Sequence, residues 1–324
     1  MRDLISTDLF TGVEETIRTG ISQLMEKRQR ISIISDANLL GALSIAPLEA
    51  SFIDSNLPYM RRIGSINYSV PENSIIIHNN GGEKGVSWDN EKNILSISET
   101  LSPALSGHLG DDKIGPLTTV AMCHSIAQLI SPSGVLVRKI RPWAISGNWI
   151  HACMDMTYDP VYVSLKELLT LEGTIRVVPL PEVPSPNVES LDFIDENSLI
   201  DISGRWDSMG EEGRARSLSH LCRGALDSTS PSTSRLEEIV WNCILASGWQ
   251  VDLASQIRAS PIIWKNRNPK IAASEAIDML LDLADSSHSS ILITLSQPLQ
   301  LILRGRTSDS TATLIPQDGQ LIRG

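Results

Sequence analysis

Short runs of β-branched residues alternate with helical patterns in the first half of the chain. The runs are ISIIS (31–35), SIIIH (74–78) and ILSIS (94–98), and the helical patterns cover residues 39–50, 116–130 and 140–155. β-branched residues favour strands, and strands that alternate with helices pair in parallel because each helix carries the chain back across the sheet. The sequence therefore predicts an α/β fold with a doubly wound, mostly parallel sheet.

The chain of 324 residues is longer than a single hydrophobic core usually organises. An amphipathic pattern over residues 8–29 predicts a leading helix. Four prolines fall within residues 177–190, and proline both removes a backbone donor and favours extended neighbours. We therefore expect an α/β domain over residues 1–176, a linker over 177–190, and a smaller α+β domain over 191–324. Within that second domain, helices are expected over 211–226, 233–247 and 270–285, followed by a small sheet in the tail.

The composition is that of a folded globular protein, with 41% hydrophobic and 20% charged residues. A formal net charge of −11 argues against strong nonspecific binding to nucleic acid or to anionic membranes. We find no apolar run of membrane-spanning length, and MRDLISTDLF lacks the apolar core of a signal peptide, so a cytoplasmic location is expected. The four cysteines are scattered without CxxC pairs and indicate neither a disulfide framework nor a zinc site.

Polar residues follow the predicted strands where each strand ends. Asp36 and Asn38 follow the first strand, His78 ends the second, Glu99 follows the third, and His151 follows an apolar helical segment. In an open α/β sheet, ligands gather beyond the carboxyl ends of the strands, because the loops there leave a crevice. We therefore expect these side chains to converge at one edge of the sheet.

The order of these segments resembles that of the DHH phosphoesterases, and of the archaeal RecJ-like exonucleases in particular. In that family the motifs are Asp-x-Asp-Gly, a second-strand Asp, Asp-His-His, and Gly-x-x-x-Asp. DANLLGA, IIIHNNGG, ILSISETLSP and AISGNWIH resemble them in turn. The likeness continues in residues 108–129, in EEIVWNCILASGW and in LILRGRTSDS. Asp36 and Gly147 are kept, while the motif acids and histidines are replaced by Asn38, His78, Ser98, Glu99, Thr100 and His151.

The resemblance implies a fold that has lost its chemistry. The family hydrolyses phosphodiesters with two divalent ions, which need several bridging carboxylates. This sequence keeps one of those carboxylates, and its end, IPQDGQLIRG, lacks the glycine-rich loop and histidine of the DHHA-type second domain. The resemblance therefore implies a catalytically inactive, RecJ-like scaffold that needs no cofactor. It would bind the GINS complex, the MCM helicase or both, like the inactive RecJ relative in the replicative helicase.

Two other functions stay open at the level of sequence. Asp36, His78, Glu99 and His151 offer two carboxylates and two imidazoles, which would suit one Mn²⁺ or Zn²⁺ ion in a metal-dependent single-strand exonuclease or small phosphoesterase. A module that binds single-stranded nucleic acid weakly is the other possibility. Asp36, followed by Ala-Asn at a strand end, is also an ordinary helix cap, and we favour this role for Asp36 over that of a metal ligand. Arg304 and Arg306 lie where the resemblance places the substrate face, and arginines also occur simply as solvated residues of an edge strand.

Overall fold

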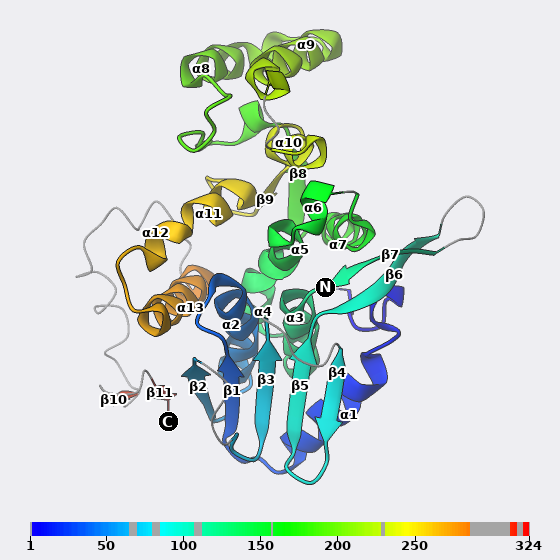
Figure 1. Cartoon of the computed structure of the whole chain (residues 1–324), viewed down its shortest axis with the longest axis vertical. Helices are drawn as coiled ribbons and strands as arrows, with labels where there is room; N and C mark the ends of the chain where they lie inside the picture. The colour runs from blue at the N-terminus through cyan, green and yellow to red at the C-terminus, as the bar shows by residue number, and fades with distance from the viewer. Residues whose placement is uncertain are drawn as a thin grey trace.

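A seven-stranded mixed sheet forms the centre of the computed structural model, which describes residues 2–64, 70–79, 85–106, 112–156, 158–227, 231–285, 312–315 and 320–323. Its strand order is β10-β11-β2-β1-β3-β5-β4 (Figure 1). The strands are β1 (Ile31–Ser35), β2 (Tyr59–Ile63), β3 (Ser74–His78), β4 (Val86–Asp89), β5 (Ile94–Ser98), β10 (Ala312–Ile315) and β11 (Gln320–Arg323).

The four central strands β2, β1, β3 and β5 run parallel, while β4 and β11 pair antiparallel with their neighbours. The predicted α/β class and mostly parallel sheet are confirmed. Strands β1, β3 and β5 coincide with the three predicted runs. Two small antiparallel sheets lie outside the main one, formed by β6 (Thr100–Ser106) with β7 (Asp112–Leu117) and by β8 (Ile175–Val178) with β9 (Cys243–Ala246).

Most of the predicted helices are present. The helices are α1 (Glu14–Glu26), α2 (Leu39–Asp54), α3 (Thr119–Ile130), α4 (Val135–Ile140), α5 (Ser146–Ile150), α6 (Cys153–Met156), α7 (Pro160–Leu171), α8 (Glu196–Arg205), α9 (Glu211–Leu221), α10 (Thr233–Val240), α11 (Leu253–Ala259), α12 (Pro261–Trp264) and α13 (Pro269–Asp285). The single helix predicted over 140–155 is broken into short turns of helix. Among the described residues, none of the helices combines the length and apolar character that crossing a bilayer requires.

The helix predicted over residues 233–247 is wrong in its second half. Helix α10 stops at Val240, and Cys243–Ala246 form strand β9, which pairs with β8 and is buried throughout. A short apolar run such as CILA fits a buried strand as well as a helix, and here the pairing with a distant segment decides between them.

Side chains show which face of the sheet three helices cover. Ile33, Ile75 and Leu95 are register partners across β1, β3 and β5, so they share one face. A Cβ on Gly20 of α1 would lie 3.0 Å from Leu95, which places α1 on that face. Arg61 of β2 is the register partner of Ile33 and bonds to both α2 and α13. Helices α1, α2 and α13 therefore share one face of the sheet.

The proline-rich segment predicted as a linker begins in β-structure. Val178 belongs to β8 and is buried, as are Leu180, Val183 and Val188 farther along. The backbone N–H of Ser185 donates to the carbonyl of Gln250 at 2.8 Å. The described part of this segment is thus packed against the second half of the chain, and the division into domains at this point stays a prediction.

The tail differs from the predicted separate sheet. β10 and β11 form the expected hairpin, but β11 also pairs antiparallel with β2, so the hairpin extends the main sheet. The physical reason is that β2 would otherwise leave a row of unpaired backbone groups at its edge. The predicted contact residues Arg304 and Arg306 lie outside the described residues.

Arg141, which follows α4, and Glu172, at the end of α7, form a buried ion pair. We expect this pair to make the stability of the fold depend on pH. Both oxygens of Glu172 accept bonds from Arg141, and one also accepts from Thr174. Burial alone would raise the pKa of Glu172, but these bonds outweigh it and the pKa lies below its ordinary value. A lowered pKa stabilises the fold at pH values above the pKa of the unfolded state, which is about 4.3. This stabilisation is lost as the pH falls through the pKa of the folded state.

We therefore expect Glu172→Gln to lower the free energy of unfolding by about 2 kcal/mol near neutral pH, with the deficit shrinking below a pH of about 4. Urea unfolding across that pH range measures it. Glu167→Gln, at an exposed position of the same helix, is the control and should show a small, pH-independent difference. A deficit for Glu172→Gln that stays constant down to a pH of about 3 would contradict the pKa assignment.

Candidate functional site

The turn after β1 carries the first predicted motif. Asn38 has extended backbone geometry, and its side-chain Oδ1 accepts a hydrogen bond of 2.8 Å from the N–H of Gly41, so Asn38 is the N-cap of α2. Asp36 contributes its backbone carbonyl, which accepts from the N–H of Asn38 at 3.0 Å. The prediction that Asp36 caps this helix is wrong, because the chain enters the helix two residues later.

Four neutral side chains meet near the carboxyl ends of β1 and β3. Asn79 donates from Nδ2 to Oγ of Ser35 at 3.1 Å, and its Oδ1 accepts from Oγ1 of Thr119 at 2.6 Å. The Oγ atoms of Ser44 and Thr119 are 3.1 Å apart in turn. We call Ser35, Ser44, Asn79 and Thr119 the amide–hydroxyl network. It joins β1, the end of β3, α2 and α3, at the edge where the family's motif carboxylates are expected.

Glu99 and His151 are the predicted site residues that the structure brings into contact. Nε2 of His151 lies 3.3 Å from Oε1 of Glu99. Nδ1 of His151 accepts a bond of 3.1 Å from the backbone N–H of Cys153, so the proton of a neutral ring sits on Nε2, facing Glu99. The hydrogen bond to Glu99 raises the pKa of His151, and partial burial opposes this.

His78 ends β3 opposite Ser98 of β5 and is half-buried. Asp36, His78, Glu99 and His151 all belong to the described part of the chain. Across that part, no three His, Cys, Asp or Glu side chains come together as a group that could hold a metal ion. The mononuclear metal site predicted for these four residues therefore stays a prediction.

A buried polar group that sequence reasoning missed lies behind His151. Asp159 accepts from Nδ2 of Asn148 at 3.0 Å and caps α7 through the N–H groups of Val161 and Tyr162. Burial raises the pKa of its carboxyl. The Asp159-Pro160 pair was a usable signal, since Asp before Pro is typical of a helix start.

Gly147, the glycine that the fourth motif keeps, has a packing reason of its own. A Cβ at this position would lie 2.5 Å from Oγ1 of Thr118, which donates to Oδ1 of Asn148 at 3.1 Å. Such a distance is too short for any side chain. The close approach of α5 to the start of α3 therefore explains why this position is glycine.

The capping geometry predicts which motif residue matters for stability. We expect Asn38→Ala to lower the free energy of unfolding by about 1 kcal/mol, because the N–H of Gly41 loses its acceptor. Asp36→Ala, the neighbouring control, should change stability by less than about 0.5 kcal/mol. Urea unfolding of both variants tests this, and a larger loss for Asp36→Ala than for Asn38→Ala would contradict the assignment of the cap.

Comparison with solved structures shows a distant likeness of fold. No family model and no curated protein matches the chain. The fold is similar to the crystal structure of CDC45 from Entamoeba histolytica, with a TM-score of 0.45 and 9% sequence identity, over 92% of this chain and 74% of that one.

Proposed function

We propose that this chain is a non-catalytic, RecJ-like scaffold protein of the DNA replication machinery. The amide–hydroxyl network is the observation that supports the non-catalytic part of this proposal. Ser35, Asn79 and Thr119 use their polar atoms on one another at the edge where two divalent ions would need bridging carboxylates. Neutral amides and hydroxyls cannot balance the charge of such an ion pair.

A second observation supports the absence of catalysis: a residue of the first motif caps α2. Asn38 stands where the motif resemblance places a carboxylate, and its oxygen is engaged with Gly41 in capping α2. An oxygen held by a cap is not available to bridge metal ions without giving up that cap. The replication role itself, with GINS, MCM or both as partners, rests on the resemblance of the motif order to the RecJ-like family.

A nuclease assay together with metal analysis tests the catalytic half of the proposal. The purified chain is incubated with single-stranded DNA and RNA in Mn²⁺, beside Asp36→Ala and the surface control Asp3→Ala. We expect no release of nucleotides above background, and the same background for all three proteins. Release that Asp36→Ala abolishes and Asp3→Ala retains would overturn the proposal, more so if one ion per chain is found in the wild type.

The altered metal enzyme is the second candidate, and the Glu99–His151 contact favours it. It predicts that Glu99→Gln and His151→Ala each reduce metal-dependent turnover, while a scaffold predicts no turnover to reduce. The partner half of the proposal is tested separately by co-elution of the chain with GINS and MCM subunits of its own organism. If neither subunit co-elutes under low salt, the replication role is contradicted.

A further inference from the structure

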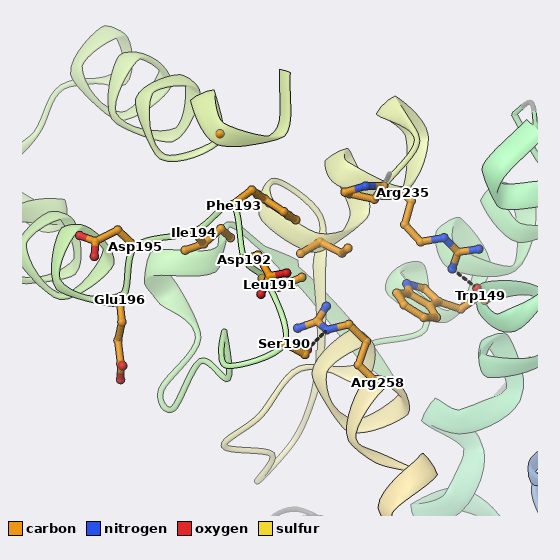
Figure 2. A pocket seen from close by; sticks show the side chains of 13 residues that line it. Trp149, Ser190, Leu191, Asp192, Phe193, Ile194, Asp195, Glu196, Arg235 and Arg258 are labelled. Atoms are coloured by element: carbon orange, nitrogen blue, oxygen red, sulfur yellow. Dashed lines mark hydrogen bonds between the residues drawn. The ribbon is translucent and has the colours of Figure 1, made fainter. Parts of the chain in front are cut away.

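A pocket of about 910 Å³ lies among α5, residues 190–196, α10 and α11 (Figure 2), and its lining residue Arg235 bonds to the carbonyl of His151. Trp149 closes one side from α5, residues 190–196 line another, and α10 and α11 contribute Arg235 and Arg258. A pocket of this size is large enough for a small organic ligand or the end of a peptide.

Arg235 is already neutralised. Its Nη2 and Nε atoms each lie 2.7 Å from an oxygen of Asp155, and Nη1 donates to the backbone carbonyl of Trp149. The guanidinium also stacks over the ring of Trp149, 4.6 Å from its centre. Figure 2 shows the Arg235 side chain directed toward Trp149 and the helix that carries it. Arg235 therefore shapes the pocket wall without offering a free positive charge.

Arg258 is different, because the acceptors described around it are neutral. Nε donates to Ser190 at 3.3 Å, and Nη2 donates to the carbonyl of Asn187 and to Oγ of Ser255, both at 3.0 Å. Nη1 is enclosed and has no hydrogen-bond acceptor among the described residues. Burial lowers the pKa of the guanidinium. The buried carboxylate of Asp252 opposes this shift from a distance, and its own hydrogen bonds go to Ser255. A buried donor without an acceptor, on a cation whose described hydrogen-bond acceptors are all neutral, points to a missing negatively charged group.

The other residues that line the pocket restrict the kind of molecule that carries this negatively charged group. The apolar part of the wall consists of Trp149, Leu191, Phe193, Ile194 and Ile239. Three acids also belong to the lining, and Figure 2 shows Asp195 and Glu196 directed away from Arg258. Asp195 is committed to capping α8 through the N–H of Ser198 at 2.8 Å. Three carboxylates in the lining, with one arginine that Asp252 already offsets in part, disfavour a phosphate with two negative charges or a nucleic acid chain.

We propose that this pocket binds a carboxylate carried on an apolar or aromatic body, with the carboxylate paired to Arg258. Because Nη1 is enclosed, pairing requires the guanidinium to turn and to exchange some of its bonds to Ser190, Asn187 and Ser255 for bonds to the carboxylate. The body then lies against Phe193 and Ile239. The same chemistry is offered by a free organic acid and by the last residue of a peptide. The inference goes beyond the scaffold role and does not depend on it.

Isothermal titration calorimetry of the full chain tests the proposal with matched pairs of probes. Octanoate represents the free acid, and N-acetyl-leucyl-phenylalanine with a free carboxyl end represents the peptide. Octanamide and the amide of the same peptide are their uncharged controls, and AMP is the phosphate control. We expect binding of at least one acid and loss of binding with its amide, and the stronger of the two acids identifies the source.

Variants assign the binding to the pocket. Arg258→Gln is expected to weaken the preferred acid by about tenfold or more, since it removes a charge-assisted pair. Asp192→Asn, at an exposed rim position, is expected to tighten it by about twofold to fivefold, because a repulsive charge is removed. Arg205→Gln, on α8 and outside the pocket lining, is the matched arginine control and should leave affinity unchanged.

Three results would overturn the proposal. They are the absence of binding by both acids, equal binding of an acid and its amide, and tighter binding of AMP than of either acid. Should Arg258→Gln fail to fold, Asp192→Asn and Phe193→Ala decide instead. Phe193→Ala is expected to weaken the acid by about fivefold through lost apolar contact, and unchanged affinity in both variants would place the binding elsewhere.

Discussion

Replacing Arg61 with methionine is expected to lower the free energy of unfolding by about 3–5 kcal/mol. Arg61 donates from Nε and Nη2 to both oxygens of Glu49, at 2.5 and 2.8 Å, and both side chains are almost fully buried. Its Nη2 also reaches Asp278 of α13 at 2.7 Å. The substitution leaves the carboxylate of Glu49 buried with Tyr59 as its remaining described hydrogen-bond donor. An uncompensated buried charge is among the most destabilising changes a core can undergo.

Urea unfolding of Arg61→Met measures this loss, and two further variants test its cause. Arg18→Met removes an exposed ion pair with Glu14 and should cost less than about 1 kcal/mol. In the double variant Arg61→Met with Glu49→Met, the stranded charge is gone, so we expect stability to recover toward wild type. A single variant within about 1 kcal/mol of wild type, or a double variant no more stable than the single, would contradict this account.

The role of Arg61 illustrates what the sequence could not predict. In YMRRI, two adjacent arginines are typical of a solvated edge, and the strand was not predicted. The structure buries Arg61 and leaves Arg62 half-buried, because period-two alternation directs the first toward the helices. Its partners come from α2 and from Asp278, more than 200 residues farther along. No local pattern contains that information.

Elements with a strong local signal were predicted correctly. β1 and β3 are apolar runs buried almost throughout, and α2 follows directly with a long apolar helical pattern. β6 and β7 were missed because Pro103 and Pro116 lie inside them, and proline argues against a strand wherever it removes a ladder donor. β6 and β7 nevertheless pair with each other, and a register shift beside Pro103 lets the ladder accommodate the proline.

In the candidate site too, some features could be predicted from the sequence and others could not. The positions of polar residues after the strands could be predicted from the sequence, and Glu99 does contact His151. The choice between Asp36 and Asn38 as helix cap was not readable, since both residue types cap helices and the backbone dihedrals of the turn decide. The bond between Asn79 and Thr119 joins residues 40 positions apart and depends on how α3 packs beside β3.

Gly41→Ala is expected to lower the free energy of unfolding by about 2–3 kcal/mol, although alanine is the better helix former. A Cβ at Gly41 would lie 2.2 Å from the backbone carbonyl oxygen of Asp36 and 2.9 Å from Oγ of Ser35. Neither the turn nor the first residues of α2 can move away without disturbing the Asn38 cap, whose acceptor oxygen is bonded to the N–H of Gly41 itself. The glycine is required by the close approach of the turn to the helix.

Gly204→Ala is the matched control, because Gly204 lies inside α8 and a Cβ there would meet nothing within 4 Å. Helix propensity then acts alone, and the substitution is expected to raise the free energy of unfolding by about 0.5–1 kcal/mol. Urea unfolding of the two variants therefore gives opposite signs if packing decides at Gly41. Equal stabilisation in both would mean that the turn after β1 can relax, and the close approach inferred for Asp36 and α2 would have to be abandoned.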